Sequence, residues 1–414
     1  MSRDFPVRPN LEQLKHQAKD LLRAIKRGDP DAISDLREFH PNPPEPTSAK
    51  LADAQTTLAR SFGVPSWLRM VQACQMTAAI WSNDVATVRE LVLKHPNLLH
   101  EDARGVESNW GPPMSHAANL GHNEIITMLR DLGADDLDRA FGRATLQGRI
   151  ETARMLHAMG AKPAPDEVLG PCETLSPTGL AFALDLGCPF ADAQGDALAP
   201  IAMLLETYSR WPEGKHRCLE IVNERVMPLP DTPTMALHRG RIDLLEEHLR
   251  RDPQLFTRTF THEEIYPPSL GCHADHSLAL HGTPLAGATL LHIAVDDDSI
   301  DNARWMLAHG ADPNARAAID SDGFGGHTAL FGCVVSQPHR CGRDREAAFT
   351  RLLLDHGADP NVHASLRKRL RFVEDETEHE YRDVTPLSWG AQFHDQDWVN
   401  RSAMKLIAEA GGIA

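Results

Sequence analysis

Residues 308–314 read AHGADPN, and residues 355–361 repeat the pattern as DHGADPN. Each copy follows an apolar run at helical spacing, as in the leucines at 352–354. Because glycine readily adopts the left-handed backbone that ends a helix, Gly310 and Gly357 are expected to stand directly after helices. The recurring pattern therefore predicts helices that end at glycine and continue into an extended loop.

Weaker copies of this helix stop are DLGAD at 131–135 and AMGAKP at 158–163. A second pattern precedes the stops and starts a short helix, as in PMSHAA at 113–118 and TLLHIA at 289–294. Thr or Ser before such a helix caps its free amides, and proline in the first turn loses no hydrogen bond. The resulting unit of two helices and a glycine stop resembles the ankyrin repeat, whose period is about 33 residues.

Much of the histidine content has a structural interpretation within this resemblance. His116, His238 and His292 fall in the first-helix motif, His122 follows the glycine of a tight turn, and His309 and His356 precede the glycine stops. We expect these side chains to form structural hydrogen bonds to the backbone rather than to bind a ligand.

The resemblance covers roughly residues 75–412. It implies an all-α fold, an ankyrin-like solenoid of about eight degenerate helix pairs. Residues 1–74 are expected to form a helical N-terminal cap, similar to the helical lead-in of some bacterial ankyrin repeat proteins. Insertions near 257–287, 318–327 and 366–383 interrupt the repeats and are expected to emerge as long loops on one edge.

The composition excludes several classes of partner. The 58 acidic residues outnumber the 42 basic ones, and the net charge of −16 repels nucleic acids and anionic membranes. The sequence has no apolar run of about 18 residues, and its first residues lack the apolar segment of a signal peptide. The seven cysteines include no CxxC pair and indicate reduced thiols. We therefore expect a cytoplasmic protein that binds neither nucleic acid nor membranes.

The insertion at 257–287 is unusually rich in groups that can bind metals. Cys272, His273, His276 and His281 are the candidate ligands for zinc or iron. Their spacing matches no zinc-finger pattern, and adjacent Cys and His are an awkward pair for one ion. The alternative is an ordered loop whose Tyr, Pro and His residues pack over the groove, and no cofactor is expected in that case.

The same insertion also carries the candidate catalytic groups Glu264, Tyr266 and His276, which could perform general acid–base chemistry. An enzyme built on them would be a hydrolase or lyase acting on a small molecule in the groove. The chain has no G-x-S-x-G elbow, no H-E-x-x-H and no phosphate-binding loop. The catalytic hypothesis therefore depends on this His, Cys and Glu cluster alone.

The other two insertions have simpler interpretations. Residues 318–327 read AIDSDGFGGH, which lacks the last acidic ligand of a calcium loop and predicts a flexible tip that presents Phe324. Residues 366–383 begin basic and turn acidic, which predicts an antiparallel hairpin with cross-strand charge pairs. The alternative for these charges is an electrostatic partner site.

The resemblance to ankyrin repeats implies a protein-binding module that holds a protein partner in its concave groove and at its loop tips. The expected anchors are the aromatic side chains at predicted tips, Trp110, Tyr266, Phe324 and Tyr381. The competing hypothesis is an enzyme or metal-dependent sensor whose site lies under the 257–287 insertion.

Overall fold

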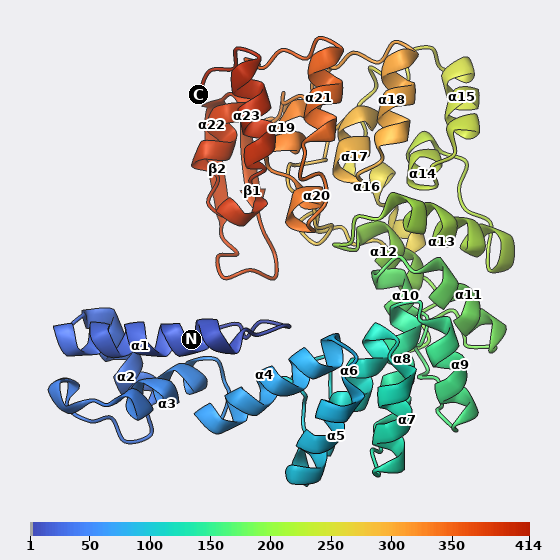
Figure 1. The fold of residues 1–414 in the computed structure, drawn as a ribbon. Helices are drawn as coiled ribbons and strands as arrows, with labels where there is room; N and C mark the ends of the chain where they lie inside the picture. The colour runs from blue at the N-terminus through green and yellow to red at the C-terminus, as the bar shows by residue number, and fades with distance from the viewer. Residues whose placement is uncertain (1–2) are drawn as a thin grey trace. The chain divides into compact units, whose positions relative to one another are not determined.

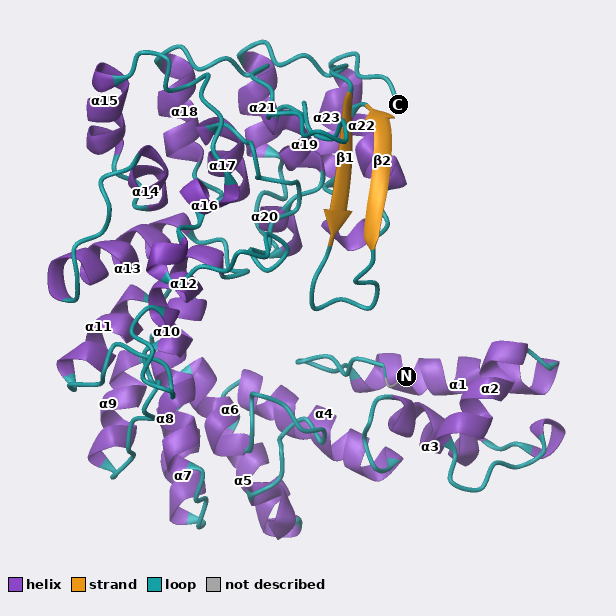
Figure 2. Cartoon of the chain, turned by 180° about the vertical axis from the view of Figure 1, so that it is seen from behind, coloured by secondary structure: helices purple, strands orange, loops and turns teal. Residues whose placement is uncertain are grey.

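The computed structural model describes residues 3–414 and shows a mostly helical chain. Across these residues it contains 23 α-helices and one two-stranded antiparallel sheet (Figures 1 and 2). The predicted helical class is confirmed, with the hairpin as its exception. The chain divides into two compact units, Met1–Ala164 and Pro165–Ala414.

Unit 1 starts with three helices that pack against one another around two small apolar clusters, and it continues with helix pairs. Leu14, Ala18 and Ile25 face inward from the first helix, which is capped by the Asn10 side chain and ends at left-handed Gly28. The second helices follow the first through tight turns, as at Gly121. The helices of unit 1 are α1 (Leu11–Arg27), α2 (Pro30–Phe39), α3 (Leu51–Ser61), α4 (Trp67–Trp81), α5 (Val85–Lys94), α6 (Pro113–Leu120), α7 (Asn123–Asp131), α8 (Leu137–Leu146) and α9 (Ile150–Ala158), with short 3-10 turns at Pro46–Ser48 and Pro96–Leu99.

Unit 2 contains the remaining helices and the hairpin. The strands are β1 (Ala364–Arg369) and β2 (Glu378–Val384), and short 3-10 turns lie at Pro268–Leu270 and Gln396–Trp398. The helices are α10 (Leu169–Glu173), α11 (Pro177–Asp185), α12 (Ala199–Glu206), α13 (Pro212–Arg225), α14 (Pro233–His238), α15 (Ile242–Arg251), α16 (His262–Ile265), α17 (Leu290–Asp296), α18 (Ile300–Ala308), α19 (Ala329–Val334), α20 (Gln337–Arg340), α21 (Ala348–Asp355), α22 (Pro386–Gln392) and α23 (Arg401–Glu409).

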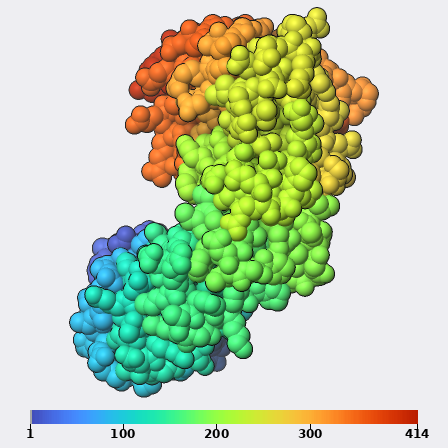
Figure 3. All heavy atoms as spheres, turned by 90° about the vertical axis from the view of Figure 1, so that its right-hand side faces the viewer, coloured from blue at the N-terminus to red at the C-terminus, as the bar shows by residue number. Residues whose placement is uncertain are grey.

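Within unit 2, the first helices of successive pairs pack against one another, and so do second helices. Among the short first helices, α14 contacts α17, α17 contacts α19, and α19 contacts α22. Among the second helices, α21 contacts α23. Figure 1 shows α15, α18, α21 and α23 in a row. In the space-filling view of Figure 3, yellow-green atoms of residues near 200–260 cover the face of unit 2 turned to the viewer. One continuous apolar core joins these helices.

The repeated ADPN segment connects successive helix pairs through its asparagine. Gly310 and Gly357 adopt φ of 94° and 87°, as the sequence predicts. The Asn314 side chain donates to the carbonyl oxygen of Gly357 at 2.9 Å and accepts from the Asp359 amide at 2.7 Å. Asn361 forms the equivalent pair of bonds to Gly411 and Ile413. The pattern therefore joins adjacent repeats besides ending each helix.

The structural role predicted for the motif histidines is confirmed at four of the six positions. His309 and His356 donate from Nδ1 to the carbonyl oxygens four residues earlier, each at 2.8 Å. His292 donates from Nε2 to the carbonyl oxygen of His327 at 3.1 Å, and His238 is described below. The imidazole of His122 forms no hydrogen bond within the described residues, and His116 is the other exception. Its buried ring nitrogens have no hydrogen-bond partner among residues 3–414, and burial lowers its pKa to about 3.

Candidate functional site

The 257–287 insertion is an ordered loop that is closed at its base. The Phe260 amide donates to the carbonyl oxygen of Ala288 at 2.8 Å, and the Gly287 amide donates to that of Phe260 at 2.8 Å. Thr261 begins α16 with a capping box, in which its hydroxyl and the Glu264 carboxylate each accept a backbone N–H. The insertion therefore adopts a fixed conformation in unit 2, as the ordered-loop interpretation predicts.

Three consecutive aspartates follow the body of α17 and bind three cations from distant segments. Asp296 pairs with Arg210 at 2.8 Å, and Asp297 pairs with Lys215 at 3.1 Å. Asp298 pairs with Arg343. Carboxylates at a helix C-terminus are disfavoured by the helix dipole, and all three are less than 9% exposed, so their stability depends on these cations. We call residues 296–298 the acidic triplet.

Two side chains that contact the acidic triplet, His238 and Arg210, also bind backbone carbonyl oxygens of the insertion. His238 at the end of α14 contacts Asp297 through Nδ1 at 2.9 Å and donates from Nε2 to the carbonyl oxygen of Ile265 at 3.0 Å. Arg210 also donates to the carbonyl oxygen of Leu280. The acidic triplet thereby fixes both ends of the insertion against the helices, since Ile265 and Leu280 lie on its two sides.

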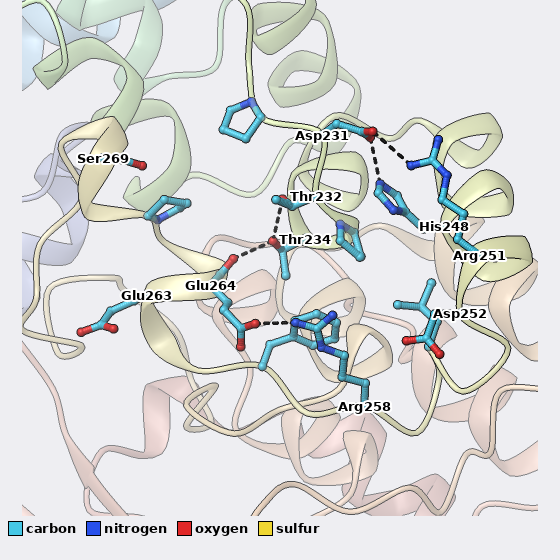
Figure 4. Close-up of a pocket in the computed structure, with 15 residues that line it drawn as sticks. Asp231, Thr232, Thr234, His248, Arg251, Asp252, Arg258, Glu263, Glu264 and Ser269 are labelled. Atoms are coloured by element: carbon cyan, nitrogen blue, oxygen red, sulfur yellow. Dashed lines mark hydrogen bonds and ion pairs between the residues drawn. The ribbon is translucent and has the colours of Figure 1, made fainter.

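One cavity of about 530 Å³ is lined in part by residues from the first half of the insertion, between 258 and 269 (Figure 4). Its two arginines are already paired with carboxylates. Glu264 pairs with Arg258 at 2.5 Å, and Asp231 contacts both Arg251 at 3.2 Å and His248 at 3.0 Å. Figure 4 shows these carboxylates turned toward their partners along the cavity wall. We therefore do not choose this cavity as the main binding site.

A larger groove of about 1370 Å³ lies within unit 2 and is lined in part by residues from the second half of the insertion, between 271 and 280. Its lining combines exposed aromatic rings with arginine. Tyr208, Trp211 and Phe372 line it and are 46%, 42% and 73% exposed. Arg340 also lines it, and this exposed guanidinium has no hydrogen-bond or ion-pair partner in the described part of the chain. We call this the unit 2 groove.

The candidate metal ligands do not come together as a set. Cys272 is buried, and burial raises the pKa of its thiol well above the usual range. The Nδ1 atom of His273 contacts Glu206 at 2.8 Å, and that of His281 donates to the carbonyl oxygen of Ala279. His276 instead faces another imidazole of the loop. Within residues 3–414, no three His, Cys, Asp or Glu side chains are grouped so that they could hold a metal ion.

The candidate catalytic residues point to different places. Glu264 is engaged by Arg258 and by the start of α16. Tyr266 is buried, with its ring 5.7 Å from that of His238, whereas the His276 ring lies 6.2 Å from that of His262. No hydrogen bond or ion pair joins Glu264, Tyr266 and His276 in the described residues.

The expectation that four aromatic residues are exposed tips is wrong for three of them. Tyr266, Phe324 and Tyr381 are only 1%, 5% and 6% exposed. Tyr266 packs in the core of unit 2, and the Tyr381 ring lies 4.7 Å from the Trp389 ring. Trp110, in unit 1, is half-buried with its ring 4.7 Å from that of His116. The predicted position of these residues in loops did not indicate that other parts of the chain cover their rings.

The prediction of a hairpin at 366–383 is confirmed, and one of its predicted charge pairs forms near the tip, between Arg371 and Glu376 at 3.1 Å. β1 and β2 are antiparallel, with Arg367 opposite Glu380. Arg367 instead binds Asp320 at 2.5 Å and Asp322 at 3.1 Å in the preceding insertion. The guanidinium carbons of Arg367 and Arg382 lie 4.7 and 4.3 Å from the centre of the Phe324 ring. The 318–327 insertion is therefore docked on the hairpin and is not a flexible tip.

A model of the Ankyrin repeat family matches residues 286–318. The match spans α17 and α18, and it supports the assignment of this segment to the ankyrin repeats. None of the curated proteins matches the chain. No helix among the described residues has the length and apolar character needed to cross a membrane.

Sequence reasoning missed the residues that line the unit 2 groove. Tyr208 and Trp211 lie between α12 and α13, where the repeat pattern is weakest. The available signal was the pair of large aromatic residues in TYSRW at 207–211, in a stretch without helical periodicity. Phe372 lies beyond β1 and has a left-handed φ of 61°, which marks it as a turn residue.

Proposed function

We propose that the chain is a protein-interaction module and that the unit 2 groove holds a segment of its protein partner. The observation that carries this proposal is the presence of three exposed aromatic side chains around one large groove. The match of residues 286–318 to the Ankyrin repeat supports it, because such repeats generally mediate contacts between proteins.

The size and lining of the groove favour a polypeptide over a small ligand. Small-molecule sites measure about 300–1,000 Å³ and enclose most of their ligand, whereas this groove measures about 1370 Å³. Tryptophan, tyrosine and arginine are the side chains that contribute most binding energy in protein interfaces. Trp211, Tyr208 and Arg340 supply one of each at the groove.

The wider architecture belongs to the same proposal. Within each unit the helix pairs stack as ankyrin-like repeats in a solenoid, and residues 1–74 cap the first pair of unit 1. All seven cysteines are free, which suits a reducing compartment, and we place the module in the cytoplasm.

The test is quantitative co-purification of the partner with matched surface variants of the whole chain. Trp211→Ala is expected to weaken partner recovery at least about tenfold, since a central aromatic anchor contributes about 2 kcal/mol or more. Ile319→Ala is the control, because Ile319 is 64% exposed and lies outside the groove. Equal recovery with both variants, each shown to be folded by circular dichroism, would refute the groove as the binding site.

A further inference from the structure

The arginines that line the unit 2 groove are mostly neutralised by carboxylates of the chain itself. Three of the four are in ion pairs, namely Arg210, Arg343 and Arg371. Arg340 on α20 is the only lining arginine without an ion pair among the described residues. The arginines therefore leave one unmatched positive charge in the groove.

The acidic side chains of the groove are mostly unmatched. Five of them line it, and Glu206 contacts the imidazole of His273 at 2.8 Å. The other four have no ion pair in the described part of the chain. All four lie between residues 166 and 196, and we call them the acidic wall: Asp166, Glu173, Asp192 and Asp196. The groove therefore carries a surplus of negative charge on this wall.

Two of the exposed aromatic side chains lie next to the acidic wall. The Thr207 hydroxyl, directly before Tyr208, donates to the carbonyl oxygen of Glu173 at 2.6 Å. A Cβ atom at Gly214 would lie 2.3 Å from the backbone carbonyl oxygen of residue 175 and 2.4 Å from the Trp211 ring. The turn after Glu173 and the Trp211 indole are therefore neighbours. A cation bound there can pair with a carboxylate while it contacts an aromatic ring.

Two buried polar side chains that line the groove each have an atom without a partner. Gln337 and Trp398 are 3% and 4% exposed. Gln337 donates from Nε2 to the Tyr208 carbonyl oxygen at 2.7 Å, whereas its Oε1 atom and the Nε1 atom of Trp398 have no hydrogen bond within residues 3–414. The two residues are neighbours, because the Ser336 amide donates to the Trp398 carbonyl oxygen at 3.0 Å. One free acceptor and one free donor suit a peptide unit, which has one N–H and one C=O.

We propose that the unit 2 groove binds a basic segment of the protein partner, whose lysine or arginine side chains lie on the acidic wall. This inference rests on the proposed function and adds the chemistry of the partner to it. The basic side chains pair with Asp166 and Glu173 and contact the Trp211 ring, while the main chain of the segment satisfies the two buried polar atoms. Arg340 repels a basic side chain on the α20 side, which confines the basic residues to the acidic wall.

The first test is selection of peptides from a displayed library of random dodecapeptides on the immobilised full chain. Peptides that bind the wild-type chain but not Trp211→Ala bind at the groove, since basic peptides held only by the general negative charge of the surface bind both proteins equally. We expect lysine and arginine to be enriched in the Trp211-dependent peptides relative to the unselected library.

The second test measures the Kd of one selected peptide for the full chain by fluorescence anisotropy. Glu173→Gln keeps the shape of the side chain and removes its charge, and it is expected to raise the Kd about fivefold. Glu246→Gln is the matched control, because Glu246 on α15 is exposed and lies outside the groove, and it should leave the Kd unchanged.

The outcomes separate this inference from the proposed function. If the Trp211-dependent peptides are not enriched in basic residues, or if Glu173→Gln binds the peptide as tightly as Glu246→Gln does, the inference of a basic segment is wrong and the groove remains the proposed binding site. If no peptide depends on Trp211, the proposed function and this inference are both wrong.

Discussion

Neutralising the centre of the acidic triplet should strongly destabilise unit 2. Asp297→Asn keeps the shape of the side chain and removes its charge. Asp297 is 4% exposed, and it compensates Lys215, which is 5% exposed, while also contacting His238. Breaking a buried pair on one side leaves an uncompensated charge, which costs about 3–5 kcal/mol. We expect the free energy of unfolding to fall by that amount.

The assay is urea unfolding of the whole chain, followed by tryptophan fluorescence and far-UV circular dichroism. Because the chain has two units, the transitions are fitted separately when two are resolved. Asp301→Asn is the control, since its pair with Arg304 on α18 is exposed and exposed pairs contribute at most about 1 kcal/mol. Lys215→Met combined with Asp297→Asn should recover much of the loss. If Asp297→Asn costs no more than Asp301→Asn, the reasoning about this buried pair is wrong.

Three further predictions concern particular side chains. Phe324→Ala should cost about 3 kcal/mol in urea unfolding because the ring is buried, whereas an exposed tip would change stability by less than about 0.5 kcal/mol. Gly325→Ala should also destabilise, since a Cβ there would lie 2.0 Å from the Ala318 carbonyl oxygen, and an unchanged midpoint would contradict this contact. Burial raises the pKa of Asp344 to about 6, so its native state retains a proton that the unfolded state has lost, and this group lowers stability as pH rises from about 4 to 6. Asp344→Asn should remove that component, which urea midpoints at pH 4.5 and 7 would show, and an unaltered pH dependence would refute the assignment.

Local sequence patterns predicted the local structure of this chain well. Gly310 and Gly357 end their helices in the left-handed conformation because the backbone requirement is met by one residue and its immediate neighbours. The hairpin at 366–383 also follows from nearby residues. The Asn314 and Asn361 bridges are periodic too, although the hydrogen bonds themselves reach the next repeat.

The exposure of loop side chains could not be predicted in the same way. Phe324 is covered by Arg367 and Arg382, which come from a different insertion. The acidic triplet is likewise satisfied by Arg210 and Lys215, more than 80 positions earlier in the sequence. Such pairings depend on how segments that are distant in the sequence dock on one another, and periodicity carries no information about that. The aromatic lining of the unit 2 groove could not be predicted for the same reason, because its residues come from distant parts of the sequence.

The most direct test of the central claim is site-specific photo-crosslinking in an extract of the cells that naturally express the chain. A photoreactive phenylalanine analogue replaces Phe372 in the groove in one sample and the exposed Ile319 outside it in another. We predict that one partner protein crosslinks from position 372, that Trp211→Ala in the same chain abolishes this product, and that position 319 does not give it. Crosslinking of the same protein from position 319 alone, or no crosslink from position 372, would contradict the account.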